Sequence, residues 1–160
     1  MASYDRQLEI IQPSVDRLIR LPLPVSDAGL VNPLSTSPLA LIDGELLQPN
    51  TSGQWARASD AAKPSFLCFE ERGFPNNTAA KKVAGIMGPS GFLFDTIVFN
   101  SGLTTQGAAL QMGTINDATR LGANGRSGLI AYSAGVRLGY VFSVASANGG
   151  TLLRVFWTQS

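Results

Sequence analysis

The chain of 160 residues contains no histidine. That absence removes the usual general base at neutral pH, the commonest metal ligand and every catalytic triad that depends on an imidazole. Ser90, in the segment "GPSGF", does not stand in the G-x-S-x-G pattern of a nucleophile elbow. Neither phosphate-binding loop, G-x-x-x-x-G-K-S/T or G-x-G-x-x-G, occurs in the chain. We therefore expect no enzymatic activity, no cofactor and no bound metal.

Cysteine and charge are also scarce. The single cysteine, Cys68, excludes an intramolecular disulfide, and within the run "SFLCFEE" we expect it to be a buried small hydrophobe. Only 14% of the residues are charged, against about 25% in a typical soluble domain, so much of the surface is either uncharged or covered by neighbours. With 12 basic and 11 acidic residues the net charge is +1, too small for a general grip on nucleic acid or anionic lipid.

Long apolar runs are missing as well. The N-terminal sequence "MASYDRQLEIIQPSVDRLIRL" is interrupted by charges and lacks the apolar centre of a secretory signal. The longest uncharged stretch, between Asp95 and Asp117, contains polar side chains that are costly in hydrocarbon. We expect a chain that is made in the cytoplasm and that does not span a membrane.

Turn-forming residues are abundant, and they divide the chain into short apolar stretches. This spacing is typical of an all-β sandwich or barrel, and the length suits a single core. In "VRLGYVFSV" the bulky side chains alternate with smaller ones, which predicts a strand with Tyr140, Phe142 and Val144 on its core face. The run "TLLRVFWTQ" places Leu153, Val155 and Trp157 on one face, and the intervening "ANGG" predicts a hairpin.

Other strands are predicted from the same pattern. The runs "SFLCFEE" and "GFLFDTIVF" are apolar on both faces, as expected of strands that are covered twice. Further strands are expected at residues 39–42, 45–48, 54–58, 83–87, 108–112 and 128–133.

The first 38 residues differ in kind from the rest. Apolar residues at steps of three and four from Tyr4 to Leu18 form a helical stripe, but Pro13 interrupts it. The prolines of "LPLPVSDAGLVNPLSTSPLA" restrict the residues before them to extended conformations. We interpret residues 1–38 as an arm, partly extended, that leaves a single β domain at residues 39–160. The alternative is a segment that packs back on its own core.

The segment "LIDGELLQPNTSGQWARAS" predicts a hairpin that gathers several polar groups. Asp43 and Glu45 would share a face if the strand continued through Gly44, but a turn there makes them ordinary loop residues. Trp55 and Arg57 are either a packed core-edge pair or a platform for a sugar ring.

Three segments, taken in order, resemble the head decoration or cement proteins of tailed bacteriophages. They are "LVNPLSTSPLALIDGELLQPNTSGQWARAS", "KPSFLCFEERGFPNNTAAKKVAGIMGPSGFLFDTIVF" and "GLTTQGAALQM", within residues 30–112. In that family an element like "DGELLQ...GQWARA" is similar to the first hairpin of a small β-barrel domain. The expected architecture is therefore a small β-barrel or a jelly-roll-like sandwich, with a β-tulip type as a further alternative.

The resemblance implies a structural virion protein that binds the outer surface of the capsid and cements the joints between capsomers. Its partners would be the major capsid protein and other copies of itself, as a homotrimer or a dimer, without nucleic acid or membrane. The family contributes no catalytic residues. The residues implied to contact the capsid or a neighbouring subunit are Tyr4, Leu8, Ile11, Pro22, Pro24 and Trp55.

Two other functions compete with this interpretation. One is a carbohydrate-binding or host-adhesion β-sandwich of a virion, which rests on Trp55 and Arg57 as a stacking platform. The other is a small β enzyme that relies on carboxylates alone.

Overall fold

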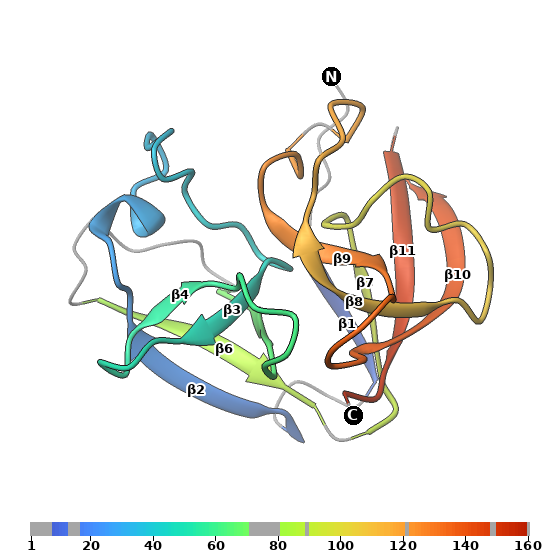
Figure 1. Ribbon diagram of the computed structural model, residues 1–160, viewed down its shortest axis with the longest axis horizontal. Coiled ribbons are helices and arrows are strands. Elements are labelled where there is room, and N and C mark those ends of the chain that lie inside the picture. Colours follow the sequence, from blue (N-terminus) through green and yellow to red (C-terminus); the bar gives the residue numbers. More distant parts are fainter. Residues whose placement is uncertain are drawn as a thin grey trace.

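The computed structural model describes residues 8–12, 17–70, 81–88, 90–120, 122–147 and 150–159. Two antiparallel sheets form a sandwich that is not closed into a barrel (Figure 1). The structure therefore confirms the predicted all-β class, and it decides for a sandwich over a barrel.

The larger sheet has six strands in the order β1-β7-β11-β10-β8-β9. Every neighbouring pair in it is antiparallel, and β10 and β11 form its longest hairpin. Its strands are β1 (Leu8–Gln12), β7 (Phe92–Thr96), β8 (Ala109–Thr114), β9 (Ser127–Ala131), β10 (Gly139–Ala147) and β11 (Gly150–Trp157).

The smaller sheet has five strands in the order β2-β6-β5-β3-β4. Along the chain, β2 is followed by a short 3-10 helix, η2 (Ala28–Val31), and then by the loop that leads into β3. Its strands are β2 (Ile19–Pro24), β3 (Leu46–Pro49), β4 (Trp55–Arg57), β5 (Phe66–Cys68) and β6 (Lys82–Met87).

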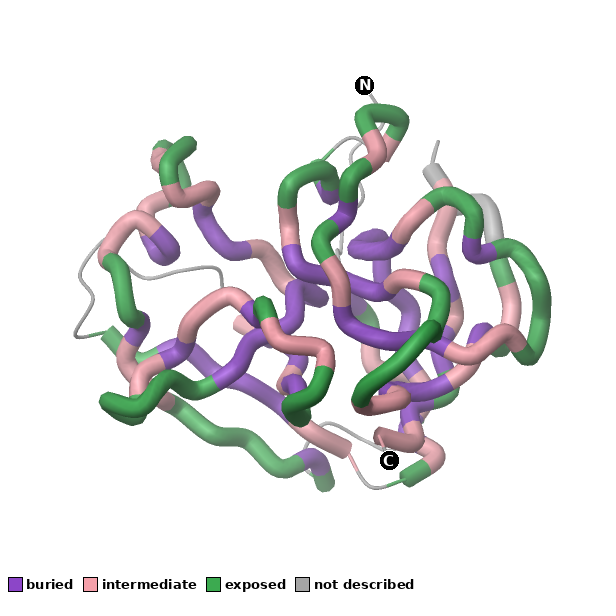
Figure 2. The backbone as a smooth tube through the Cα atoms, in the orientation of Figure 1, coloured by how far each residue is buried: buried purple, intermediate pink, exposed green. Residues whose placement is uncertain are grey.

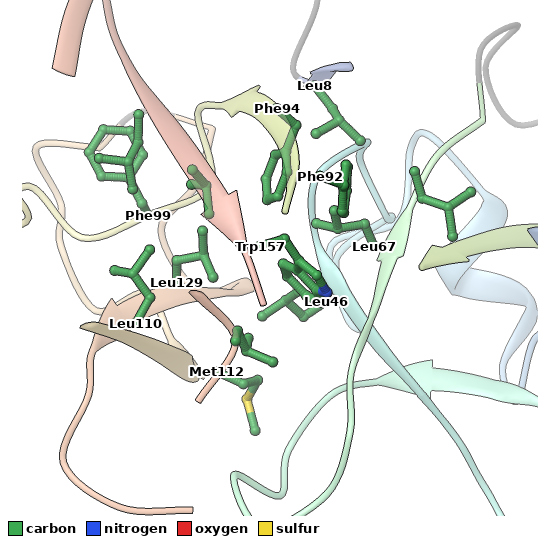
Figure 3. Close-up of a cluster of buried hydrophobic side chains, with 14 of the residues drawn as sticks. Leu8, Leu46, Leu67, Phe92, Phe94, Phe99, Leu110, Met112, Leu129 and Trp157 are labelled. Atoms are coloured by element: carbon green, nitrogen blue, oxygen red, sulfur yellow. The ribbon is translucent and has the colours of Figure 1, made fainter. Parts of the chain in front are cut away.

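The main core lies between the two sheets. Phe92, Phe94 and Trp157 from the larger sheet pack against Leu46 and Leu67 from the smaller one (Figure 3). The three aromatic rings lie within 5.9 Å of one another, centroid to centroid. Each large apolar side chain buried here contributes about 1.5–3 kcal/mol, so this layer is the chief source of stability.

A second core fills the other face of the smaller sheet. Trp55 of β4 is fully buried in it, together with Leu47, Val83 and the η2 residues Leu30 and Val31. The sheet curls far enough that Val25, just after β2, forms an isolated bridge with Trp55. Most residues of β3 and β5 are therefore buried, whichever core they face. Figure 2 shows long buried stretches of backbone within this sheet.

Part of the N-terminal segment belongs to the sheets. β1 pairs with β7 at the edge of the larger sheet, and β2 pairs with β6 at the edge of the smaller one. The described residues of the segment therefore follow the alternative in which it packs on its own core. The helical stripe from Tyr4 to Leu18 does not form a helix at residues 8–12, because pairing with β7 makes them a strand. The extended conformation predicted around Pro22 and Pro24 is found in β2.

The hairpin of β10 and β11 is confirmed, but one predicted face is not. Leu153, Val155 and Trp157 are buried as expected. In β10, however, Val141 is the buried residue, whereas Phe142 and Val144 are exposed. Tyr140, before the bulge, pairs with Phe156 on the outer face, so its predicted place on the core face was also wrong. A register shift between Val141 and Ser143 then breaks the alternation, because a β-bulge adds one residue to one strand only.

The remaining strand predictions have one further exception. β3 to β9 lie where strands are expected, within a few residues at each end. Residues 39–42 are not a strand; they lie in the loop before β3. Its main-chain groups bond elsewhere: the carbonyl of Leu39 accepts from Arg57, the N–H of Leu41 donates to the carbonyl of Leu30 in η2, and the N–H of Ile42 donates to the side chain of Glu45.

Candidate interaction surfaces

The residues implied to contact a capsid are distributed over different environments. Tyr4 lies outside the described residues. Leu8 is buried in the main core, so the structure corrects its assignment as a surface contact. Ile11 is half-buried in β1. On β2, Pro22 is exposed and Pro24 is half-buried.

Trp55 packs entirely within its own domain. Its Nε1 donates a hydrogen bond to the carbonyl of Val83 at 2.9 Å and to that of Leu21 at 3.3 Å. Its ring lies 5.0 Å from that of Phe66, and a Cβ atom added at Gly85 would fall 2.4 Å from it. With no exposed surface, Trp55 is neither a subunit contact nor a platform for a sugar ring, and both interpretations are corrected.

Arg57 takes part in a buried charge cluster instead. Its Nε donates to Glu45 Oε1 at 2.7 Å, and Arg126 Nη1 donates to Glu45 Oε2 at 2.9 Å. Glu45 is fully buried, and both arginine side chains are largely buried. We call Glu45, Arg57 and Arg126 the Glu45 cluster. It joins β4 of one sheet to the residue before β9 of the other.

The Glu45 cluster also fixes the backbone of the loop before β3. Arg57 Nη2 donates to the carbonyl of Leu39 at 2.8 Å, and Arg126 Nη1 donates to the carbonyl of Ala40. Glu45 Oε2 accepts the N–H of Ile42 at 2.8 Å. Sequence reasoning missed this cluster, because its members are 81 residues apart in the chain.

Asp43 and Glu45 do not form a pair of catalytic carboxylates. Glu45 is neutralised by two arginines, and Asp43 Oδ1 accepts the backbone N–H of Glu70 at 2.6 Å. Gly44 adopts a positive φ of 91°, as expected if the chain turns there. The two carboxylates therefore serve different structural partners.

The outer face of the larger sheet carries a row of apolar and aromatic side chains. Phe156 of β11 is paired with Leu93 of β7 on one side and with Tyr140 of β10 on the other. Tyr140 is paired in turn with Ala109, whose carbonyl accepts the N–H of Tyr132. Directly paired residues lie on one face, so Leu93, Phe156 and Tyr140 follow one another across β7, β11 and β10. Tyr132 comes one residue after the end of β9, on the other side of Ala109 of β8. We call Leu93, Phe156, Tyr140 and Tyr132 the aromatic row.

The aromatic row is flanked by fixed charges. Arg154 donates to both carboxylate oxygens of Asp95 at 2.8 and 2.9 Å, and Asp95 raises the pKa of the Arg154 guanidinium. Beside the row, the guanidinium of Arg137 lies 5.2 Å from the ring of Tyr140. Phe156 and Tyr132 are each 40% exposed. An apolar centre with a polar rim is the usual composition of a protein contact surface.

The edge of the smaller sheet at β2 has a different character. Six consecutive pairs join β2 to β6. Proline has no N–H, so the mutual hydrogen bonds of this ladder fall on Ile19, Leu21 and Leu23, and Pro22 and Pro24 turn their missing donors to the free edge. On this side of β2 only Arg20 keeps an N–H, and an edge with few donors resists the addition of another strand.

A shallow polar pocket of about 320 Å³ lies beside the loop before β9. Hydrogen bonds with Ser101 and Thr119 hold the pKa of Asp117 well below its usual range. These donors belong to the same surface loops, so Asp117 organises the turn. The lining residues are Asn100, Ser101, Gly102, Leu103, Asn116, Asp117 and Ala131.

The described residues contain no group of three or more acidic or cysteine side chains placed to hold a metal ion. In the same part of the chain, no helix is long and apolar enough to cross a membrane. Cys68 is free and buried, and burial raises the pKa of its thiol.

The fold defines an antiparallel β-sandwich protein with two large cores, a smaller cluster around Val98 and Ile115, and an apolar outer sheet face. Comparison of the chain with models of protein families, with curated proteins and with solved structures found no match in any of the three.

Proposed function

We propose that this chain is a structural virion protein that binds the outer surface of a tailed-phage capsid and cements the shell by bridging capsomers. Its partners are the major capsid protein and further copies of the chain, as a homotrimer or a dimer. The proposal joins the resemblance of residues 30–112 to one structural observation, which is the aromatic row.

The aromatic row supports the proposal because it is largely apolar, stands on a paired sheet and reaches the surface: Phe156 and Tyr132 are exposed, and Leu93 and Tyr140 are half-buried. The row runs from β7 across β11, β10 and β8 to the end of β9, and four steps of about 4.8 Å between neighbouring strands give it a length of roughly 19 Å. A stable protein contact covers about 800 Å² on each partner, and a row of this length lies at the centre of such an area. Tyrosine and phenylalanine are enriched in the centres of these contacts.

The scarcity of charge on the chain supports the same proposal. Charged side chains are depleted in contact centres, and only 14% of the residues of this chain are charged. A capsid presents the same joint many times, so contacts of modest area add up when an oligomer binds several joints at once. Attachment by a small domain therefore needs no deep pocket.

The test is sedimentation with shells assembled from the major capsid protein encoded by the same genome. The wild-type chain is expected to pellet with the shells, and the amount bound per shell is expected to reach a plateau as the concentration of the chain rises. Phe156→Asp is expected to weaken attachment about tenfold or more, because it places a charge at the centre of the aromatic row.

A matched variant controls for the added charge. Thr51→Asp introduces the same side chain at an exposed turn between β3 and β4, away from the aromatic row, and is expected to bind like the wild type. A wild-type chain that stays in the supernatant at all shell concentrations would refute the proposed function. If Phe156→Asp binds the shells as well as the wild type does, the aromatic row is not part of the contact.

A further inference from the structure

Leu34 is the most exposed large apolar side chain in the described part of the chain, at 87%. It stands in the loop between η2 and β3, which projects from the smaller sheet at the top left of Figure 1. Single apolar residues on a surface are ordinary and need no explanation by themselves. What sets Leu34 apart is how firmly its loop is held.

Short-range hydrogen bonds fix the tip of this loop. Asn32 Oδ1 accepts the N–H of Leu34 at 3.1 Å, and the carbonyl of Asn32 accepts the N–H of Ser35 at 2.8 Å. Ser35 Oγ then donates to the carbonyl of Pro38 at 2.6 Å, and the N–H of Ala40 donates back to Ser35. These bonds close the tip into a turn and engage several of its backbone groups internally.

The Glu45 cluster fixes the base of the loop. Its three side chains bond to the backbone of Leu39, Ala40 and Ile42. Burial of charged groups is costly and seldom adds net stability over an apolar alternative. In a chain with so few charges, placing three of them beneath one loop indicates that the position of that loop matters.

The loop offers a partner no charge. Residues 28–42 contain no acidic or basic side chain, and the loop around Leu34 is formed by proline, serine and threonine. Such a tip offers no ion pair to a charged partner. An uncharged apolar pocket would gain the burial of a leucine side chain without loss of loop entropy, because the loop is already ordered.

We propose that residues 32–38 form a preorganised docking tip, and that Leu34 inserts into an uncharged apolar pocket on the major capsid protein. This inference rests on the proposed function and names the anchor that it uses. Insertion of one apolar side chain into a pocket of a neighbouring molecule is a sufficient basis for repeated assembly contacts. The aromatic row lies on the other sheet, so the two contacts can be separated by mutation.

The experiment measures the binding of three variants to shells of the major capsid protein. Leu34→Ala is expected to weaken binding about tenfold or more, because it empties the pocket. Leu34→Met is expected to restore most of the binding, since it keeps the apolar volume. Ile19→Ala is the control, because Ile19 is also exposed, at 63%, but lies on the edge strand β2.

Folding is checked separately for every variant. Leu34 makes almost no contact with the rest of the chain, so Leu34→Ala is expected to change the melting temperature by no more than about 2 °C. Binding to neutral phosphatidylcholine vesicles is measured in parallel. Loss of vesicle binding in Leu34→Ala, with shell binding unchanged, would overturn a protein pocket in favour of a lipid surface.

The outcomes distinguish this inference from the proposed function. If the wild type binds shells and Leu34→Ala binds equally well, the docking tip is refuted while the proposed function stands. If the wild type does not bind shells, the docking tip and the proposed function are both refuted. If Ile19→Ala weakens binding as much as Leu34→Ala does, general surface apolarity explains the effect and the docking tip is refuted.

Discussion

Glu45→Gln is the most informative single change for the structure itself. The glutamine keeps the size of the side chain and one acceptor oxygen, but it replaces the other oxygen with a donor. In the wild type, Oε1 accepts from Arg57, and Oε2 accepts from Arg126 and from the N–H of Ile42. Whichever way the amide is turned, at least one N–H group of the protein then faces another donor.

The expected cost follows from the burial of the three side chains. Removal of one partner from a buried ion pair costs about 3–5 kcal/mol, because an uncompensated charge remains. The side chains of Arg57 and Arg126 keep 19% and 13% of their exposure, so water relieves part of the penalty. We therefore expect the lower value, about 3 kcal/mol. For a chain of this length the melting temperature would fall by roughly 6–12 °C.

The assay is urea unfolding at pH 7, followed by tryptophan fluorescence. Trp55 and Trp157 are both buried, one in each core, so the signal reports loss of the whole fold. A slope of about 1–3 kcal/mol per molar urea gives a midpoint lowered by roughly 1–3 M.

Two further variants make the result specific. Asp60→Asn removes the exposed ion pair with Lys63 and is expected to leave the urea midpoint almost unchanged, because water screens an exposed pair. Arg126→Met is expected to cost less in the Glu45→Gln background than in the wild type, since the two side chains interact. A Glu45→Gln midpoint equal to that of the wild type would refute the reasoning about the Glu45 cluster.

Three other predictions test the cores and one surface loop. Gly85→Ala should lower the free energy of unfolding by about 1–3 kcal/mol, because its Cβ would overlap Trp55, whereas Gly102→Ala, with open space around it, should cost little; equal urea midpoints would contradict the packing of Trp55. The pKa of Asp117 is lowered in the folded chain, so as the pH falls this carboxylate takes up its proton in the unfolded chain before it does so in the folded one. This carboxylate therefore contributes stability above its unfolded pKa, near 3.9, that is lost as the pH falls toward its folded value. The drop in urea midpoint between pH 7 and pH 3 should be smaller in Asp117→Asn than in the wild type, and an identical drop would count against the hydrogen bonds described. Finally, Cys68 should react with a thiol reagent at pH 8 far more slowly in the folded protein than in urea, because burial raises the pKa of its thiol and blocks access.

Most of the β architecture could be predicted from the sequence, because the apolar runs are short and turn residues separate them. β11 is the clearest case: Leu153, Val155 and Trp157 alternate with Arg154 and Phe156, and the structure buries the first set. The doubly apolar run that contains β5 also has a physical counterpart, since it lies between the main core and the core around Trp55.

Other features depend on contacts that no local pattern contains. The bulge in β10 moved Val141 into the core and left Phe142 outside, and a regular alternation cannot predict a bulge. Strand β2 was missed because two prolines argue against a strand, although they are tolerated on an edge.

The candidate surfaces were predictable to different degrees. Of the two alternatives for Trp55, packing at the core is confirmed and the surface platform is not, because a curled sheet brings β2, β4 and β6 around the ring. The uncharged run at residues 28–42 is visible in the sequence and was the one available signal for the docking tip. The Glu45 cluster beneath it unites residues from distant segments, so only the structure brings them together.

The most direct test of the proposed function is cryo-electron microscopy of purified particles from cells that carry the genome encoding this chain. We predict β-sandwich density on the outside of the capsid, repeated with the symmetry of the shell, with residues 32–38 against the major capsid protein. Well-resolved capsids whose outer surface carries no density for this chain would contradict the central claim.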